Sequence, residues 1–182
     1  MQKQTIKNLV WLDLEMTGLD LRKDKIIQVA VIVTDTQLNI LDEKGFVKYI
    51  HIEQEDVDGM EDIVKEMHTK NGVIDKCLKS ELTLEEVDKE VVEYISQYIG
   101  PKESPLCGNS IGTDRAFIKL NMPFLQKYMH YRNIDVSALK QLYAIWTDKD
   151  KYIKETDSHD ALDDIKESIK ELKYYKEHWL EK

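Results

Sequence analysis

The chain has 182 residues, 34% of them charged, and a formal net charge of −9 at pH 7. This length is enough for one domain with a substantial core, and we expect a single domain over residues 1–182. The acidic balance excludes a basic coat protein for nucleic acid, although an enzyme that holds phosphates through metal ions can be acidic.

Three strands are predicted in the first third of the chain. Residues 9–16 begin as an apolar run, residues 25–35 are rich in β-branched side chains, and residues 46–52 alternate between apolar and polar side chains. The connections between these strands are short, which predicts an antiparallel meander. The second strand is the most apolar, so we expect it to be central in the sheet.

Helical periodicity follows the strands. One helix is predicted over residues 57–71 and a short one over residues 73–78. A stronger helix begins at Thr83, because Thr83 and Glu86 fit the capping box, and residues 100–101 end it.

The second half of the chain alternates short strands with helices. Strands followed by such an alternation predict a mixed α/β fold whose sheet carries helices on its faces. The expected elements are a strand at 106–107, helices from about Asp114 and after Pro123, a strand at 134–136, a helix capped by Ser137, a mobile polar stretch at 147–157, and a closing helix at about 160–178.

Two carboxylates lie two residues apart in the first strand. Asp13 and Glu15 therefore point to the same side of it. In so acidic a chain a pair of this kind is often solvent-facing, but here the neighbouring side chains are apolar on both faces. A buried carboxylate pair needs a cation between its members, and Mg²⁺ and Mn²⁺ prefer oxygen ligands. The alternative to a surface pair is thus a divalent metal site.

The closing helix carries the second acidic motif. Asp163 points away from the apolar stripe of this helix and is expected to be solvated. Asp164 lies closer to the border of the stripe and is the better candidate to reach an interior metal site. His159 precedes the helix, where a neutral imidazole can accept a proton from water, although a cap or a surface residue is the alternative for it.

Taken together, these motifs resemble those of the DEDD exonuclease superfamily, histidine branch. The three exonuclease motifs correspond to Asp13-x-Glu15, to Asp114 at the end of the run at 108–114, and to His159 five residues before Asp164. The likeness covers nearly the whole chain and is to the oligoribonuclease family in particular. The runs that carry it are residues 11–19, 67–70, 108–112, 131–132, 135–137 and 161–168.

The resemblance implies an RNase H-like fold, a mixed sheet flanked by helices. It also implies a 3′-to-5′ exoribonuclease that hydrolyses short RNA, chiefly dinucleotides, to nucleoside 5′-monophosphates. Two divalent ions, Mg²⁺ or Mn²⁺, would be held by Asp13, Glu15, Asp114 and Asp164, and His159 would take the proton of the attacking water.

The same resemblance implies a path for the substrate. Leu19 would wedge between the two bases, and His68 would lie along the substrate. An ordinary core position is the alternative for Leu19.

A wall for the 5′ phosphate is also implied by the resemblance. Ser110, Arg132 and Ser137 would surround this phosphate, and Tyr131 would come from the second subunit of a homodimer. Arginine suits a terminal phosphate because its donors can bind two oxygens at once. The alternatives are a purely capping role for Ser137 and a plain surface position for Tyr131 and Arg132.

The remaining features concern the setting of the protein. Cys77 and Cys107 fit no metal or redox spacing and are expected to be reduced and buried, which favours the cytoplasm. No run approaches the ~18 apolar residues of a membrane span, so no membrane partner is expected. The partners that the resemblance implies are short single-stranded RNA and a second copy of the chain. Two rival functions stay open: a broader DEDD exonuclease that trims DNA or structured RNA 3′ ends, and a metal-binding interaction module without turnover. An intact His159 disfavours the module.

Overall fold

The structure is a computed structural model that describes residues 6–147, 152–154 and 160–180. His159 and most of the polar stretch at 147–157 lie outside the described residues, so the predictions made for them stay predictions.

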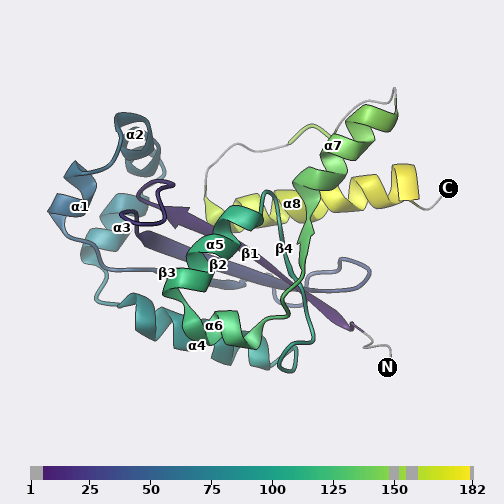
Figure 1. Cartoon of the computed structure of the whole chain (residues 1–182), viewed down its shortest axis with the longest axis horizontal. Helices are drawn as coiled ribbons and strands as arrows, with labels where there is room; N and C mark the ends of the chain where they lie inside the picture. Colours follow the sequence, from purple (N-terminus) through teal and green to yellow (C-terminus); the bar gives the residue numbers. More distant parts are fainter. Residues whose placement is uncertain (1–5, 148–151, 155–159, 181–182) are drawn as a thin grey trace.

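Five strands form one mixed sheet in the order β3-β2-β1-β4-β5 (Figure 1). Strands β1 (Asn8–Met16), β2 (Ile26–Asp35) and β3 (Phe46–Tyr49) pair in antiparallel fashion, which confirms the predicted meander. Strands β4 (Leu106–Gly108) and β5 (Asn133–Asp135) extend the sheet beyond β1 in parallel fashion. Strand β1 therefore lies in the middle of the sheet, between β2 and β4.

Helices cover both faces of this sheet (Figure 1). Helices α4 (Leu84–Ser96), α5 (Gly112–Asn121) and α6 (Pro123–Tyr128) pack over one apolar core, and α7 (Val136–Trp146) and α8 (Ala161–Tyr175) pack over the other. A single turn of π-helix extends α8 toward the C-terminus. This is the expected mixed α/β architecture.

The alternation of side chains along β1 decides what each face receives. Leu12 and Leu14 enter the core under α4, α5 and α6, whereas Trp11 enters the core under α8. Because side chains two residues apart share a face, Asp13 and Glu15 point to the α8 side with Trp11. The sheet thereby directs both carboxylates toward the start of the closing helix.

The single helix predicted over residues 57–71 is wrong. The segment forms two helices, α1 (Gln54–Asp58) and α2 (Asp62–Lys70), and α3 (Val73–Lys79) follows as expected. Helix α1 ends at Gly59 and the next begins after Glu61. Met60, between them, is buried in a separate small core, so the apolar spacing continues across a break in the helix.

The predicted caps are right at one helix and wrong at another. Thr83 and Glu86 form the predicted capping box of α4. Helix α7, however, is capped by Asp135, whose side chain accepts a hydrogen bond from the backbone N–H of Ser137. A carboxylate at the end of β5 reaches this N–H first, and Ser137 falls inside the first turn of the helix.

Both cysteines are buried and free, as expected. None of the helices that the structure describes combines the length and the apolar character needed to cross a membrane.

Candidate active site

Asp13 and Glu15 form the floor of the candidate site. Both project from the last half of β1, and the Glu15 side chain retains only 12% exposure. Glu15 is paired across the sheet with Gln28 of β2, and Asp13 with Ala30. The pairing on both sides of β1 fixes the direction of these carboxylates, because a slip of one residue would turn them to the other face.

Asp114 joins them from the first turn of α5. The turn before this helix has Ser110 in the left-handed region, with φ 49°, which reverses the chain after β4. Asp114 Oδ1 accepts a hydrogen bond of 3.0 Å from the backbone N–H of Leu14, the residue between Asp13 and Glu15. The carboxylate is 6% exposed, so α5 delivers a third buried acid to the same stretch of β1.

Asp164 completes the group from the first turn of α8. Asp160 caps this helix by accepting a hydrogen bond from the backbone N–H of Leu162. The charge of Asp164 raises the pKa of both Asp13 and Glu15, which shows that its carboxylate acts on the β1 pair. Asp163 is partly buried and less solvated than expected.

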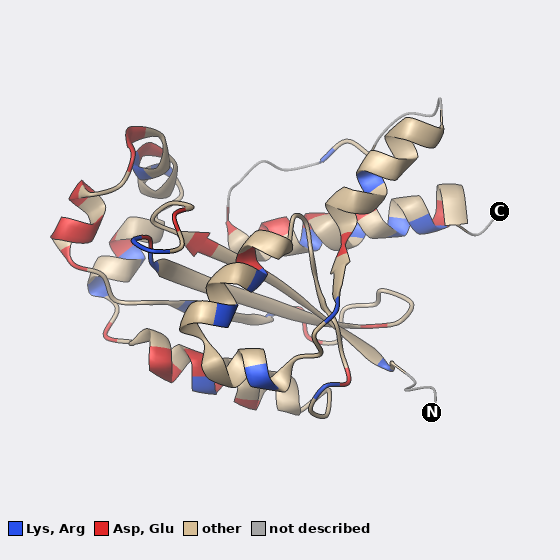
Figure 2. Cartoon of the chain, viewed as in Figure 1, with Lys and Arg blue, Asp and Glu red and all other residues tan. Residues whose placement is uncertain are grey.

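Burial and mutual repulsion set the electrostatics of these acids. Burial, followed by the charges of Asp164 and Asp114, raises the pKa of Glu15 to about 8. Burial and the three neighbouring carboxylates raise the pKa of Asp13 well above its ordinary value, and burial raises that of Asp114 to about 6. Figure 2 shows acidic segments at the end of β1 and in the first turns of α5 and α8, at one end of the sheet. We call Asp13, Glu15, Asp114 and Asp164 the carboxylate cluster.

The carboxylate cluster fits divalent metal ions by its chemistry. Its members offer only oxygen atoms and negative charge, the ligand set of hard cations. Within residues 6–147, 152–154 and 160–180, no three acidic, histidine or cysteine side chains already have the spacing of a formed metal centre. Two contacts of the chain itself occupy oxygens of the carboxylate cluster: the backbone N–H of Leu14 donates to Asp114, and Lys154 lies 3.1 Å from one oxygen of Asp164.

Leu19 lies on the surface beside the carboxylate cluster. Its side chain is 73% exposed, which rules out the alternative of a core position. It lines a hollow of about 200 Å³ with Glu15 and Met67, and another of about 350 Å³ with Gly112 and Phe117. The apolar side chain of Leu19 is therefore exposed to solvent next to Glu15.

His68 is fully buried behind Glu15 instead of lining an open surface. Its Nε2 lies 3.0 Å from the carbonyl oxygen of Met16 and 3.9 Å from Glu15 Oε2. Because a carbonyl oxygen only accepts, Nε2 carries the proton, and His68 donates a hydrogen bond to Met16, the last residue of β1.

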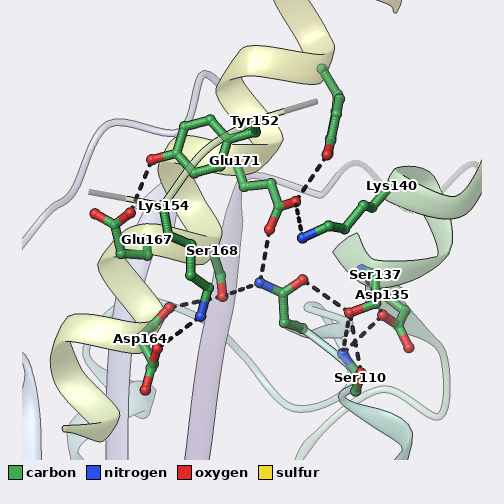
Figure 3. A network of polar contacts seen from close by, with 12 residues as sticks. Ser110, Asp135, Ser137, Lys140, Tyr152, Lys154, Asp164, Glu167, Ser168 and Glu171 are labelled. Atoms are coloured by element: carbon green, nitrogen blue, oxygen red, sulfur yellow. Dashed lines mark hydrogen bonds and ion pairs between the residues drawn. The ribbon is translucent and has the colours of Figure 1, made fainter. Parts of the chain in front are cut away.

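Ser110 and Ser137 lie together at the ends of β4 and β5, on the side of α8 (Figure 3). Their hydroxyl oxygens are 3.1 Å apart, and Asp135 Oδ1 accepts hydrogen bonds from the backbone N–H groups of both. Ser110 is exposed and Ser137 is half-buried. These two predicted phosphate-binding residues therefore share one rigid corner of the structure.

Tyr131 and Arg132 lie at the opposite end of β5. Arg132 precedes this strand, and its carbonyl accepts a hydrogen bond from the backbone N–H of Leu106 at the start of β4. Arg132 Nε donates to the hydroxyl of Tyr131, and the Tyr131 side chain is 73% exposed. Within one chain the structure brings Arg132 to Tyr131 and does not bring it to Ser110.

Three residues of this region were not predicted from the sequence. Lys154 pairs with Asp164, and Asn109 is hydrogen-bonded to both Ser137 and Glu171. Glu171 lies seven residues after Asp164, hence on the same face of α8, and it is fully buried. That spacing was the one available signal for Glu171.

A family model described as exonuclease, RNase T, matches residues 10–172 of this chain. Oligoribonuclease of Haemophilus influenzae (strain PittGG) is 45% identical over 175 residues, which cover 96% of this chain and 96% of that protein. Oligoribonuclease of Chromobacterium violaceum is 44% identical over 178 residues, which cover 97% of this chain and 98% of that protein.

Solved structures of exonuclease I share the fold. Exonuclease I of Methylocaldum szegediense superposes with a TM-score of 0.69 at 17% identity, over 96% of this chain. E. coli exonuclease I in complex with a dA16 oligonucleotide gives a TM-score of 0.68 at 16% identity, also over 96% of this chain. The chain spans about two fifths of these exonuclease I chains, 41% and 42% of their lengths. The likeness confirms the expected RNase H-like fold.

Proposed function

Since the chain belongs to the RNase T exonuclease family and has oligoribonucleases as full-length relatives, we infer that it is a 3′-to-5′ exoribonuclease acting on short RNA. The observation that carries this conclusion is the carboxylate cluster, in which acids from β1, α5 and α8 converge, and the charges of Asp114 and Asp164 raise the pKa of Asp13 and Glu15.

We propose that the carboxylate cluster holds two divalent cations, Mg²⁺ or Mn²⁺. Bound there, such cations supply an activated water and stabilise the charge on the leaving 3′ oxygen. The role of the chain is to hold the four carboxylates in place on β1, α5 and α8, so that the scissile phosphate binds against a fixed arrangement of ligands. Leu14, through its N–H, keeps Asp114 directed at β1.

His159 is proposed as the general base. It directly precedes Asp160, the N-cap of α8, and lies five residues before Asp164 in the sequence. A histidine is suited to the task because its ordinary pKa, near 6.5, lets it accept a proton at neutral pH.

Selection for dinucleotides is proposed to come from the two ends of the site. We propose that Leu19, exposed beside Glu15, contacts the bases of a short substrate and that the corner formed by Ser110 and Ser137 receives its 5′ phosphate. A third nucleotide would have to continue past this corner, where Asp135 adds negative charge.

We further propose a homodimer in which Tyr131 of the partner subunit reaches the phosphate corner, together with Arg132 of the partner subunit. Two observations support this. Both side chains are exposed and joined to each other, and in their own chain they lie at the end of β5 away from Ser110.

The test is hydrolysis of end-labelled RNAs from two to about twenty nucleotides by the purified protein with Mn²⁺. The dinucleotide should be cleaved fastest, and 5′-phosphorylated dinucleotide should bind better than a ten-nucleotide RNA. Duplex DNA and hairpin RNA with 3′ overhangs are included as competitors. Equal cleavage of all lengths would favour the broader exonuclease, and the absence of hydrolysis with intact metal binding would favour a binding module.

A further inference from the structure

A continuous chain of hydrogen bonds joins a buried carboxylate of α8 to the serine pair (Figure 3). The carboxylate belongs to Glu171, which is fully buried. Its Oε1 accepts a hydrogen bond of 2.9 Å from the Tyr175 hydroxyl and pairs with Lys140 Nζ at 3.2 Å. Its Oε2 accepts a hydrogen bond of 3.2 Å from Asn109 Nδ2. All three partners donate, so Glu171 acts only as an acceptor.

This carboxylate decides which way the Asn109 amide faces. A carboxylate cannot donate, so the NH₂ group of Asn109 must be the end that meets Glu171. The same NH₂ group donates to Ser168 Oγ at 2.8 Å, and Ser168 in turn donates to the carbonyl of Asp164 at 2.8 Å. The amide oxygen of Asn109 is therefore left facing Ser137.

The orientation of Asn109 then fixes the roles of the two serines. Ser137 Oγ donates to Asn109 Oδ1 at 3.1 Å, which uses the one proton that a hydroxyl has. Toward Ser110 it can only accept: the Ser110 N–H donates to it at 3.0 Å, and the contact of 3.1 Å between the hydroxyls has Ser110 as donor. Of the two hydroxyls, only that of the exposed Ser110 can turn its proton from Ser137 to an anion, because Ser137 Oγ then still accepts the hydrogen bond of the Ser110 backbone N–H.

We propose that Glu171 and Asn109 are positioning residues for the terminal phosphate of the substrate. They set the direction of the hydrogen bonds, so that the Ser110 hydroxyl, which donates to Ser137 in this structure, can turn its proton to a phosphate, while Ser137 orients Ser110 by accepting from its backbone N–H. The proposal rests on the proposed function, because it takes the serine corner as the phosphate site. Without an obligate acceptor at position 171, the Asn109 amide can turn over and the order of donors is lost.

The test compares Glu171→Gln with the matched control Glu167→Gln. Glu167 is also a buried acid of α8, one turn earlier, and it accepts hydrogen bonds from Tyr152 at 3.0 Å and from Lys170 at 2.8 Å. The kinetic readout is kcat and KM for a dinucleotide with and without a 5′ phosphate. The structural readout is the exchange rate of the Ser110 backbone N–H, followed by NMR.

Glu171→Gln should lower the preference for the phosphorylated dinucleotide about tenfold through KM, the loss expected when a hydrogen bond to a charged group is weakened. Its kcat for the unphosphorylated dinucleotide should stay unchanged, and the Ser110 N–H should exchange faster. Glu167→Gln should change neither. Ser110→Ala should cost more of the preference than Ser137→Ala, because only Ser110 has a proton to offer. If melting shows that Glu171→Gln does not fold, Asn109→Ala removes the same constraint and should give the same loss.

The outcomes separate this proposal from the proposed function. If wild type shows no preference for the 5′ phosphate, the phosphate corner itself is wrong. If wild type has the preference and Ser110→Ala loses it, but Glu171→Gln (or Asn109→Ala, should the former not fold) behaves like Glu167→Gln, the positioning role is overturned alone.

Discussion

The ammonium group of Lys154 lies 3.1 Å from Asp164 Oδ1, at the edge of the carboxylate cluster. The positive charge of Lys154 also opposes part of the rise in the pKa of Asp13. A cation of the chain itself therefore offsets part of the negative charge of these acids, and a metal ion must displace it from Asp164. The Lys154 side chain is 38% exposed, so it can leave without uncovering a core.

Replacing this lysine should strengthen metal binding. Lys154→Gln removes both a competitor for Asp164 and a positive charge from the site, so the Kd for Mn²⁺ should fall about threefold, the scale of a partly exposed ion pair. Lys154→Arg keeps the charge and serves as the control. Isothermal titration calorimetry measures both, and weaker Mn²⁺ binding in Lys154→Gln would contradict this competition.

Asp114→Asn should nearly abolish turnover and leave the fold intact. The amide oxygen can still accept the hydrogen bond of Leu14, but the site loses a negative ligand, so kcat should fall on the order of a thousandfold or more. Asp163→Asn is the matched control and should have little direct effect. Activity of Asp114→Asn within about tenfold of wild type would remove Asp114 from the site; an equal loss in Asp163→Asn would mean that the wrong member of the Asp163–Asp164 pair was chosen.

The metal-free protein should lose stability as the pH rises from about 4 to about 8. An unfolded chain releases the Glu15 proton near pH 4, whereas the folded metal-free protein keeps it until the raised pKa of about 8. The folded state thus binds more protons over this interval, and the free energy of unfolding falls with pH, on the order of 5 kcal/mol in total.

Urea unfolding in EDTA at several pH values measures this loss. Mg²⁺ should restore more stability at pH 8 than at pH 5, because only the ionised acids bind it. Glu15→Gln should flatten much of the dependence. Metal-free stability that rises between pH 5 and pH 8 would show that the repulsion within the carboxylate cluster is relieved in another way.

His159→Ala should depress the rate and flatten its rise with pH. In wild type the rate should increase through a pKa near the ordinary ~6.5 of histidine, because the neutral imidazole is the base. Affinity for Mn²⁺ should stay within a small factor of wild type in calorimetry. A collapse of Mn²⁺ binding in the mutant would make His159 a ligand.

The local parts of this site could be predicted from the sequence. The two-residue spacing of Asp13 and Glu15 places them on one face of a strand, since strand geometry has a short and fixed period. Helical geometry likewise gives Asp163 and Asp164 different directions, although Asp163 is more buried than expected. Linking Asp114 to these acids required the resemblance to a family, because no local pattern shows that α5 returns to β1.

Other features depend on contacts between distant segments. The burial of Met60 between two helices imitates helical spacing, so the end of α1 at Gly59 was missed. The sequence predicts Ser137 as a cap, whereas Asp135, at the end of β5, caps the helix. The burial of Glu171 depends on a partner, Asn109, that lies 62 residues away in the chain.

Mixed dimers should show whether Tyr131 acts across a subunit interface. A Tyr131→Ala chain keeps its own carboxylate cluster but offers its partner no tyrosine, whereas an Asp114→Asn chain offers the tyrosine but cannot turn over. Each pure dimer should be weakly active on 5′-phosphorylated dinucleotide.

In a dimer of one chain of each kind, the site of the Tyr131→Ala chain would receive Tyr131 of the partner subunit, so one of the two active sites would be complete. Random mixing at equal amounts should then recover about a quarter of wild-type activity in an isologous dimer. Mixing the Tyr131→Ala chain with an inactive Asp114→Asn, Tyr131→Ala chain is the control and should give no recovery. If light scattering shows that dimers form but the first mixture recovers no activity, Tyr131 acts in its own subunit.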